Sequence, residues 1–301
     1  MAYLCVVLVI FVMILDKGCY GVFSSDNVRV FLDNSSSDFS FNHMYFSVNA
    51  STLVVAGNDF LYTINVTSGE HVQTRASEVA EPQGYTTTML IPYDDSSVMT
   101  CANYSKECLT GSAPCGNNDV KCLTRSVTNM SDYSMTEMMS FSTPDAAAFI
   151  VPFDGNDFMF VGCPHVSIHH RRCAKAGISW YKIPSYSEDK VTAFKDKEAT
   201  PIITTKYVNA FPVGKFRFFF SVQNVTSDKK LVSRVAHICQ VANTDITKKT
   251  YVDMELRCGD LSVLVAVETV TVGNTSIIVA AFTNGTVSTL CAYTLDQLKE
   301  R

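Results

Sequence analysis

The run from Cys163 to Cys173, CPHVSIHHRRC, is the stretch of the chain whose residue types are best suited to metal binding or catalysis. Zinc takes thiolate sulfur and imidazole nitrogen in tetrahedral sites, and this run holds two cysteines and three histidines. The spacing does not fit a zinc finger, and in an oxidising compartment the two sulfurs are expected to bond to each other. We therefore expect a disulfide-closed loop with a positive patch, which is either a solvated surface or a docking site for an acidic partner or glycosaminoglycan. The patch comprises His165, His169, His170, Arg171 and Arg172.

Other candidates for catalysis are weaker. Cys239 follows His237 by two residues, a spacing that puts both side chains on one face of a strand without implying a thiolate–imidazole pair. The paired acids at 94–95 and 188–189 stand in turn-like sequence, and each pair has too few oxygen ligands for calcium. No nucleophile-elbow, zinc-protease or phosphate-loop motif occurs. We expect no enzyme, no metal and no cofactor.

Composition limits the class of partner. The chain has 301 residues, 24 Lys and Arg against 29 Asp and Glu, and a formal net charge of −5. This balance excludes an overall basic nucleic-acid binder. Apolar residues make up 47%, unlike the composition of a disordered chain. The eleven cysteines are many for a cytosolic protein, in which thiols stay reduced.

The N-terminus indicates secretion. Residues 3–15 are apolar and uncharged, but this run is too short for a bilayer that needs about 20 apolar residues. Cys19 and Gly21 place small residues at the −3 and −1 positions of a cleavage site. We expect residues 1–21 to be a signal peptide, with a buried core strand as the alternative. No later run is long enough to span a membrane.

Glycosylation sequons point to the same extracellular compartment. Eight Asn-X-Ser/Thr sequons occur, against about three expected by chance from the Asn, Ser and Thr content. Such an excess favours a glycosylated surface. The sequon asparagines are Asn34, Asn49, Asn65, Asn103, Asn129, Asn224, Asn274 and Asn284.

Pairs of apolar runs joined by short turns recur along the chain and predict antiparallel strands. The clearest pair flanks Asn284-Gly285, a dipeptide that favours a type I′ turn with positive φ at both central positions. Another flanks residues 154–156. Helical periodicity is confined to a weak segment at 130–139 and a possible turn at 296–301. Several strands are apolar on both faces, which stacked propeller blades would cover and a two-sheet sandwich would not. We expect an all-β propeller.

Several segments resemble a sema domain in the right order. Residues 41–44 (FNHM) and 53–62 are similar to the opening blade, where an N-H/T-M-type entry precedes a V-x-V-G-A-x-N-x-L/I-Y strand pair. Residues 207–239, ending in RVAHIC, resemble the fourth blade. Residues 251–258 are similar to a short strand that closes on a Cys, and 289–301 to the S-A-L-C-A-F segment. Semaphorins, plexins and the hepatocyte-growth-factor-receptor family share this domain. The RVAHIC run and the Lys-Glu-Arg tail are most similar to plexins.

This resemblance implies a seven-bladed β-propeller of sema type. Residues 22–301 would supply about four to five antiparallel four-stranded blades, so we expect a partial sema domain from a fragment, a truncated isoform or an incomplete gene model. An unfinished ring would leave the apolar face of its last blade open. Residues 81–201 match only loosely, and 81–85 lack the Cys-rich loop that plexins carry after the first blade.

The resemblance also implies disulfide pairings. Cleavage after Gly21 would leave nine cysteines, an odd number. The counterparts of Cys258 and Cys291 pair with each other in plexins. The counterpart of Cys239 pairs with a cysteine beyond the end of this chain, so Cys239 is expected to be unpaired.

Six further cysteines remain. Cys163 and Cys173 are close enough in sequence to form a local bridge. The other four allow three connectivities. Analogy with the family favours Cys101–Cys122 enclosing Cys108–Cys115.

The leading functional hypothesis is an extracellular recognition module of a plexin-like receptor that binds a semaphorin in cell-surface guidance signalling. In plexins the loops of blades three and four form the binding surface, but no contact residue can be carried over to this chain. Plexin signalling needs a membrane span and a cytosolic GTPase-activating part, and this chain has neither. It would be secreted as given or belong to the ectodomain of a plasma-membrane receptor, and it could dimerise. The alternatives are a secreted semaphorin-like ligand or decoy, and a glycosidase-like propeller with two carboxylates at its axis.

Overall fold

The computed structural model describes 15 segments of the chain, and the expected signal peptide lies outside them. The chain divides into Met1–Asp38 and Phe39–Arg301, and every described strand belongs to the second unit. The described residues are 41–47, 51–57, 60–65, 68, 71–75, 86–94, 96–103, 120–130, 133–139, 146–162, 177–183, 204–225, 230–239, 249–272 and 275–299.

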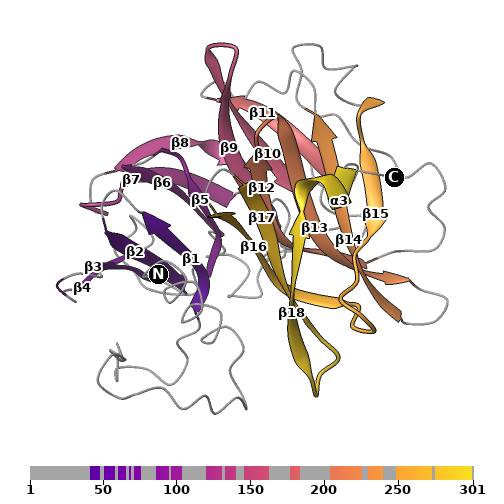
Figure 1. The fold of residues 1–301 in the computed structure, drawn as a ribbon. Coiled ribbons are helices and arrows are strands. Elements are labelled where there is room, and N and C mark those ends of the chain that lie inside the picture. Colours follow the sequence, from indigo (N-terminus) through magenta and orange to yellow (C-terminus); the bar gives the residue numbers. More distant parts are fainter. Residues whose placement is uncertain are drawn as a thin grey trace, which may run out of the picture. The chain divides into compact units, whose positions relative to one another are not determined.

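Five antiparallel sheets follow one another along the chain (Figure 1). The first contains β1 (Phe41–Ser47), β2 (Thr52–Gly57), β3 (Phe60–Asn65) and β4 (His71–Arg75). The second contains β5 (Thr86–Pro92), β6 (Ser97–Asn103), β7 (Val120–Ser126) and β8 (Tyr133–Met139). The third contains β9 (Ala147–Phe153), β10 (Asn156–Gly162) and β11 (Ile178–Ile183). The fourth contains β12 (Thr204–Val213), β13 (Phe216–Val225), β14 (Lys230–Cys239) and β15 (Val252–Glu255). The fifth contains β16 (Val263–Val272), β17 (Thr275–Thr283) and β18 (Ser288–Thr294), followed by helix α3 (Leu295–Lys299).

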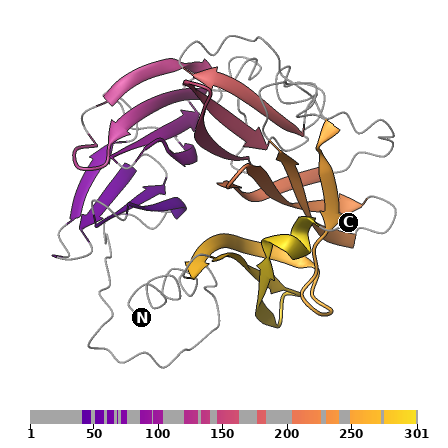
Figure 2. The same cartoon turned by 45° about the horizontal axis from the view of Figure 1, so that its top comes forward.

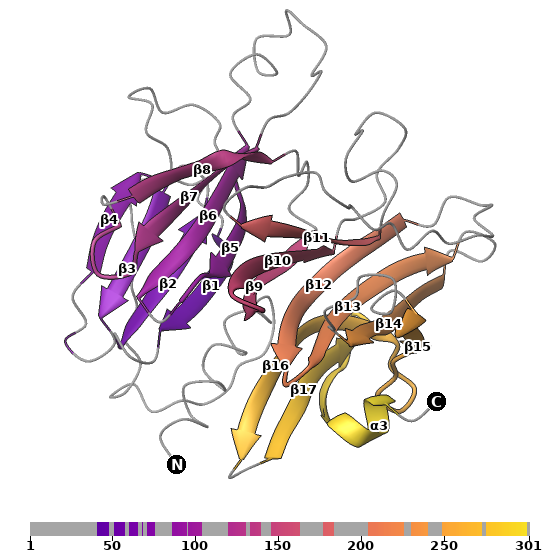
Figure 3. The ribbon, with the colours of Figure 1, turned by 90° about the horizontal axis from the view of Figure 1, so that it is seen from above.

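Each sheet is a meander, and the sheets stack through their first strands. The first strand of each sheet, β1, β5, β9, β12 or β16, contacts the first strand of the next (Figures 2 and 3). The all-β propeller fold and its four to five blades are thereby confirmed. The expectation of four strands in every blade holds for three sheets, whereas the third and fifth have three strands among the described residues. Within the same residues, no strand of the first sheet pairs with one of the fifth.

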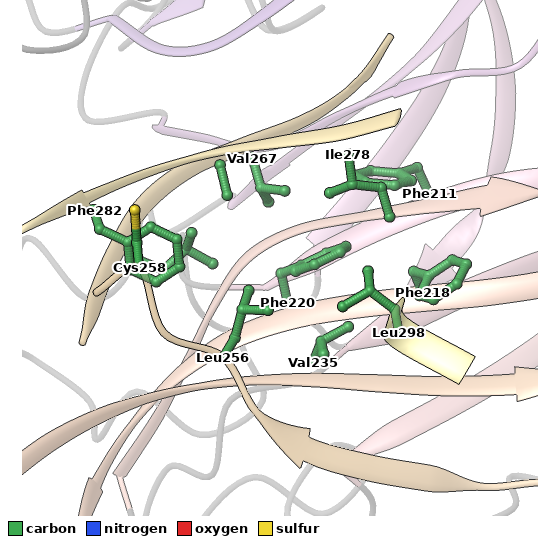
Figure 4. Packing of buried hydrophobic residues seen from close by; sticks show 12 residues of the cluster. Phe211, Phe218, Phe220, Val235, Leu256, Cys258, Val267, Ile278, Phe282 and Leu298 are labelled. Atoms are coloured by element: carbon green, nitrogen blue, oxygen red, sulfur yellow. The ribbon is translucent and has the colours of Figure 1, made fainter. Parts of the chain in front are cut away.

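Apolar cores lie between neighbouring sheets, because the middle strands are apolar on both faces. Met159 and Phe160 are adjacent on β10, and each is almost fully buried. Met159 belongs to the core between the second and third sheets, and Phe160 to the core between the third and fourth. Figure 4 shows the core between the fourth and fifth sheets, which Phe220 and Phe282 fill from opposite sides. This arrangement confirms the reasoning that favoured a propeller over a sandwich.

Single polar side chains connect successive sheets. The hydroxyl of Tyr93, after β5, donates to Asp157 of the third sheet at 3.1 Å. The hydroxyl of Tyr207, on β12, donates to the carbonyl of Gly177 at 2.6 Å. These bonds satisfy polar atoms near the sheet boundaries and fix the register of one blade against the next.

Two local predictions were wrong. The weak helical segment at 130–139 contains strand β8 instead, because pairing with β7 overrides its local periodicity. At Asn284-Gly285 only Gly285 has positive φ, 94°, so the turn is not type I′ at these two residues. The side-chain oxygen of Asn284 accepts hydrogen bonds from the backbone N–H of Thr286 and Val287, and the backbone N–H of Asn284 donates to the Val287 carbonyl at 3.2 Å. The turn at Asp154-Gly155 has φ values of 51° and 70°, as a type I′ turn requires.

Candidate functional site

The two described disulfides fix strands at different places in the fold. Cys101 on β6 and Cys122 on β7 are directly opposite in the strand register, with Cα atoms 4.1 Å apart. Both are fully buried in the core between the second and third sheets. The bridge is the one favoured from the sequence, while Cys108 and Cys115 lie outside the described residues.

The second bridge joins the fourth sheet to the fifth. Cys258, which follows β15, bonds to Cys291 on β18 with a Cα separation of 5.8 Å. Next to it, the hydroxyl of Tyr293 donates to the carbonyl of Arg257 at 2.7 Å. The connection between sheets is therefore anchored onto β18 both covalently and by a hydrogen bond, at the pair of cysteines that the resemblance implied.

Cys239 is a free thiol at the end of β14. Its side chain is half-buried, and its backbone N–H donates to the hydroxyl of Thr250 at 2.8 Å. His237 lies buried between the rings of Phe216 and Phe218.

The basic run that contains Cys163 and Cys173 lies outside the described residues, as do His165, His169, His170, Arg171 and Arg172. Its disulfide, its positive patch and the zinc alternative therefore stay sequence predictions. In the part of the chain that the structure describes, no three His, Cys, Asp or Glu side chains gather as a metal site would require.

The sequons differ in exposure. Asn65, Asn129 and Asn284 are exposed. Asn224 is half-buried near the end of β13, and its side-chain oxygen is buried without a hydrogen-bond partner in the structure. Asn103 lies on β6, and its side chain is not described. Asn34, Asn49 and Asn274 lie outside the described residues.

A cavity of about 250 Å³ lies among the first strands of the second to fifth sheets. Its lining includes Met89, Ala147, Lys206, Asn209 and Val265. Sequence reasoning missed this feature, part of whose lining lies at irregular strand pairing. β1, β5, β12 and β16 each have an irregular register at one point, and such bulges re-aim a strand without a sequence signature of their own. None of the residues that line the cavity is a carboxylate.

Asn209 connects this cavity to Glu268 on β16. Its amide nitrogen donates to the carbonyl of Val267 at 2.8 Å and to the carboxylate of Glu268 at 3.0 Å. The surrounding strands desolvate the carboxylate and raise the pKa of Glu268 to about 7, against the lowering effect of the Asn209 bond. Solvent still reaches the side chain, so screening limits the free energy involved.

No protein-family model matches the chain, and no curated protein matches its sequence. Solved structures do match its fold. Two structures of the plexin A4 extracellular region superpose with a TM-score of 0.60 at 13% identity. They cover 87% of this chain, which spans 34% and 27% of the two plexin chains. Drosophila semaphorin 1a, extracellular domains 1–2, superposes with a TM-score of 0.55 at 11% identity, covering 88% of this chain and 55% of its own.

These likenesses define the class of fold. The protein has a β-propeller of sema type, and its five sheets are blades of that propeller. The particular proteins that it is similar to in fold are the extracellular regions of a plexin and a semaphorin. Among the described residues, no helix has the length and hydrophobicity that a membrane span needs.

Proposed function

We propose that the chain is the extracellular recognition module of a plexin-like semaphorin receptor. The observation that carries this proposal is the likeness to the plexin A4 extracellular region over 87% of the chain. The plexin-like run RVAHIC supports it, since it forms the end of β14, the third strand of the fourth sheet. In this reading, the chain would be secreted or form part of a plasma-membrane receptor.

The architecture suits recognition by loops. The middle strands of the sheets are buried on both faces, and the aromatic rings of Phe149, Phe160 and Phe219 pack across the boundary between the third and fourth sheets. A rigid scaffold of this kind can hold surface loops in fixed positions for a protein partner. We place the semaphorin-binding surface on the loops of the third and fourth sheets.

A second candidate is a secreted semaphorin-like ligand or decoy. The observation in its favour is the likeness to semaphorin 1a, which has a TM-score of 0.55 over 88% of this chain. The two readings predict opposite partners, because a receptor module would bind semaphorins and a ligand or decoy of the semaphorin type would bind plexins.

Binding measurements separate these readings. The full chain would be produced in secreting eukaryotic cells, immobilised, and exposed to panels of semaphorin and plexin ectodomains. Binding to a semaphorin supports the receptor reading. Binding to plexins alone supports the second candidate, and binding to neither panel contradicts both. Light scattering on the same preparation would establish whether the chain dimerises.

An added glycan can locate the binding surface. Asp154→Asn with Asn156→Thr introduces a sequon into the β9–β10 turn of the third sheet, and Asn tolerates the positive φ of 51° at position 154. We expect semaphorin affinity to fall about tenfold or more, since a glycan excludes a partner from its surroundings.

The matched control carries its glycan between the fourth and fifth sheets, in the turn that follows the half-cystine Cys258. Asp260→Asn creates a sequon with Ser262 there, and residue 260 is exposed. Affinity should change little in this control. Unchanged affinity in the third-sheet variant, with its glycan confirmed by mass spectrometry, would remove the β9–β10 turn from the binding surface.

A further inference from the structure

The turn between β17 and β18 contains the only Asn-Gly dipeptide of the chain. Thr283 and Ser288 are the last paired residues of the two strands, so residues 284–287 form a turn beyond the end of the sheet. Asn284 and Gly285 are both exposed there. In an Asn-Gly dipeptide the glycine nitrogen can reach the side-chain amide carbon, because glycine has no Cβ to hinder the approach. The dipeptide therefore has the atoms needed to close a five-membered imide.

Three donors converge on the side-chain oxygen of Asn284. It accepts hydrogen bonds from the N–H of Thr286 at 3.0 Å, the N–H of Val287 at 2.9 Å and the hydroxyl of Thr286 at 2.9 Å. When a nucleophile adds to an amide carbon, negative charge develops on the amide oxygen, and donors already aimed at that oxygen stabilise the charge. The turn thus surrounds the Asn284 amide with the kind of donors that form an oxyanion hole.

The nucleophile and the leaving group of such a reaction are also defined by the turn. The N–H of Gly285 donates to the hydroxyl oxygen of Thr283 at 3.0 Å, so the proton that this nitrogen must lose already has an oxygen acceptor. The Thr283 hydroxyl in turn donates to the carbonyl of Val287 at 3.1 Å. Within the described part of the chain, no hydrogen bond holds the amide nitrogen of Asn284, which is free to leave as ammonia.

We propose that Asn284, where it carries no glycan, is a deamidation site whose reaction the turn itself promotes. The nitrogen of Gly285 loses its proton to a base and bonds to Cγ of Asn284. The bond from Cγ to Nδ2 then breaks, and Nδ2 takes up a proton and leaves as ammonia. Water adds to one of the two carbonyl carbons of the resulting succinimide and opens the ring. Opening at Cγ gives aspartate at position 284, and opening at the main-chain carbonyl carbon gives isoaspartate.

The two products differ in what they do to the turn. Aspartate keeps a side-chain oxygen that can accept the bonds from Thr286 and Val287, and it adds one negative charge. Isoaspartate inserts a methylene group into the main chain, which displaces the N–H of residue 284 from the Val287 carbonyl, now 3.2 Å away. Either product removes the sequon, so a deamidated chain can no longer be glycosylated at this position. The inference does not depend on the proposed function.

The test follows the unglycosylated protein over time. The full chain would be secreted into a bacterial periplasm, where disulfides form without N-glycosylation, and incubated at neutral pH and body temperature. Peptide mapping by mass spectrometry would quantify the change from amide to acid. Asn65 is the internal reference, because its side-chain oxygen also accepts a backbone N–H, from Ser68, but a valine follows it. Asn284 should convert at least about tenfold faster than Asn65. Equal rates at the two sites would overturn the proposal.

Two substitutions at Thr286 test the role of the donors. Thr286→Ala removes the hydroxyl donor and keeps both backbone donors, so deamidation of Asn284 should slow about two- to tenfold, as expected for one lost hydrogen bond. Thr286→Ser is the matched control, because it keeps the hydroxyl and should react at the rate of the parent. If Thr286→Ala reacts faster than the parent, the hydrogen bonds protect the amide, and the inference is wrong. An unchanged rate in Thr286→Ala would equally overturn the promoting role of the turn.

Discussion

Gly162, the last residue of β10, permits a close approach between the third and fourth sheets. A Cβ atom at this position would lie 2.5 Å from Cδ1 of Tyr207 and under 3 Å from two more atoms of that ring. Tyr207 cannot easily move away, because it is buried against Phe219 and its hydroxyl donates to Gly177. Burial raises the pKa of Tyr207 well above its usual value, so the hydroxyl stays protonated as a donor.

Gly162→Ala should therefore destabilise the fold by about 1–3 kcal/mol, the range found for overpacked cores. Guanidinium unfolding of the parent and the variant would measure this loss. Tyr207→Ala removes the ring that the new methyl group meets, so the double variant should be less destabilised than the sum of the two single variants. If the free-energy losses of the two single variants simply add in the double variant, the contact between the new methyl group and the Tyr207 ring is not the cause of the destabilisation.

Glu268 gives the fold a pH dependence with a defined sign. Its pKa is raised from 4.5 to about 7, so the folded state binds the proton more tightly than the unfolded state does. The stabilisation that comes from this tighter proton binding is fully present below pH 4.5 and is lost as the pH rises through about 7. Thermal melts from pH 4.5 to 8 should show a decline that Glu268→Gln reduces, since Gln can still accept the bond from Asn209. If the melting temperature of Glu268→Gln declines with pH as much as that of the parent, the decline comes from titratable groups other than Glu268.

At the scale of the strands, prediction from sequence worked where local signals agree. Residues 149–153 and 158–162 were expected to form a hairpin around Asp154-Gly155, and β9 and β10 do so. The short helix α3 lies within the turn expected at 296–301, apart from its first residue. These elements combine turn residues of known φ preference with apolar runs of strand length.

Prediction failed where a tertiary contact or a side chain competes with the local signal. The register irregularities between Thr87 and Met89 and between Tyr207 and Asn209 arise from pairing with a neighbouring strand, and they occur at residues that line the cavity among the first strands. At Asn284 the side-chain oxygen accepts hydrogen bonds from two backbone N–H groups of the turn. Neither effect can be derived from residue type and spacing.

The Cys258–Cys291 bridge should contribute to the stability of the fifth sheet. It links residues 33 positions apart, and closing a loop of this size restricts the unfolded chain by about 2–4 kcal/mol. Replacing both cysteines with Ala should lower the free energy of unfolding by that amount in guanidinium under non-reducing conditions. Cys239→Ala is the control, because this thiol is free and its removal breaks no bridge. Equal losses in the two proteins would show that the bridge adds nothing beyond the cavity left by a sulfur.

At the scale of the whole propeller, each sheet is held by apolar cores that it shares with its neighbouring sheets. The core between the first and second sheets contains Leu61, and the core between the fourth and fifth contains Leu264. Among the described residues, these two clusters share no member, and two further cores lie between them. Stability in such serial architectures is approximately a sum of unit and nearest-neighbour terms. A substitution in the core at one end of the series should therefore destabilise mainly the sheets at that end.

Leu61→Ala and Leu264→Ala form a matched pair that tests this serial coupling. Both side chains are nearly fully buried, and each truncation should destabilise its own core by about 2–5 kcal/mol. Hydrogen exchange of the native protein should then accelerate in β1 to β8 for Leu61→Ala and in β12 to β18 for Leu264→Ala, because local opening follows the weakened interface. The third sheet, which contacts both neighbours, should respond less to either. Uniform acceleration of all five sheets in both variants would mean that the blades unfold as one cooperative unit, and that the stability of any recognition loop depends on every blade rather than on its own.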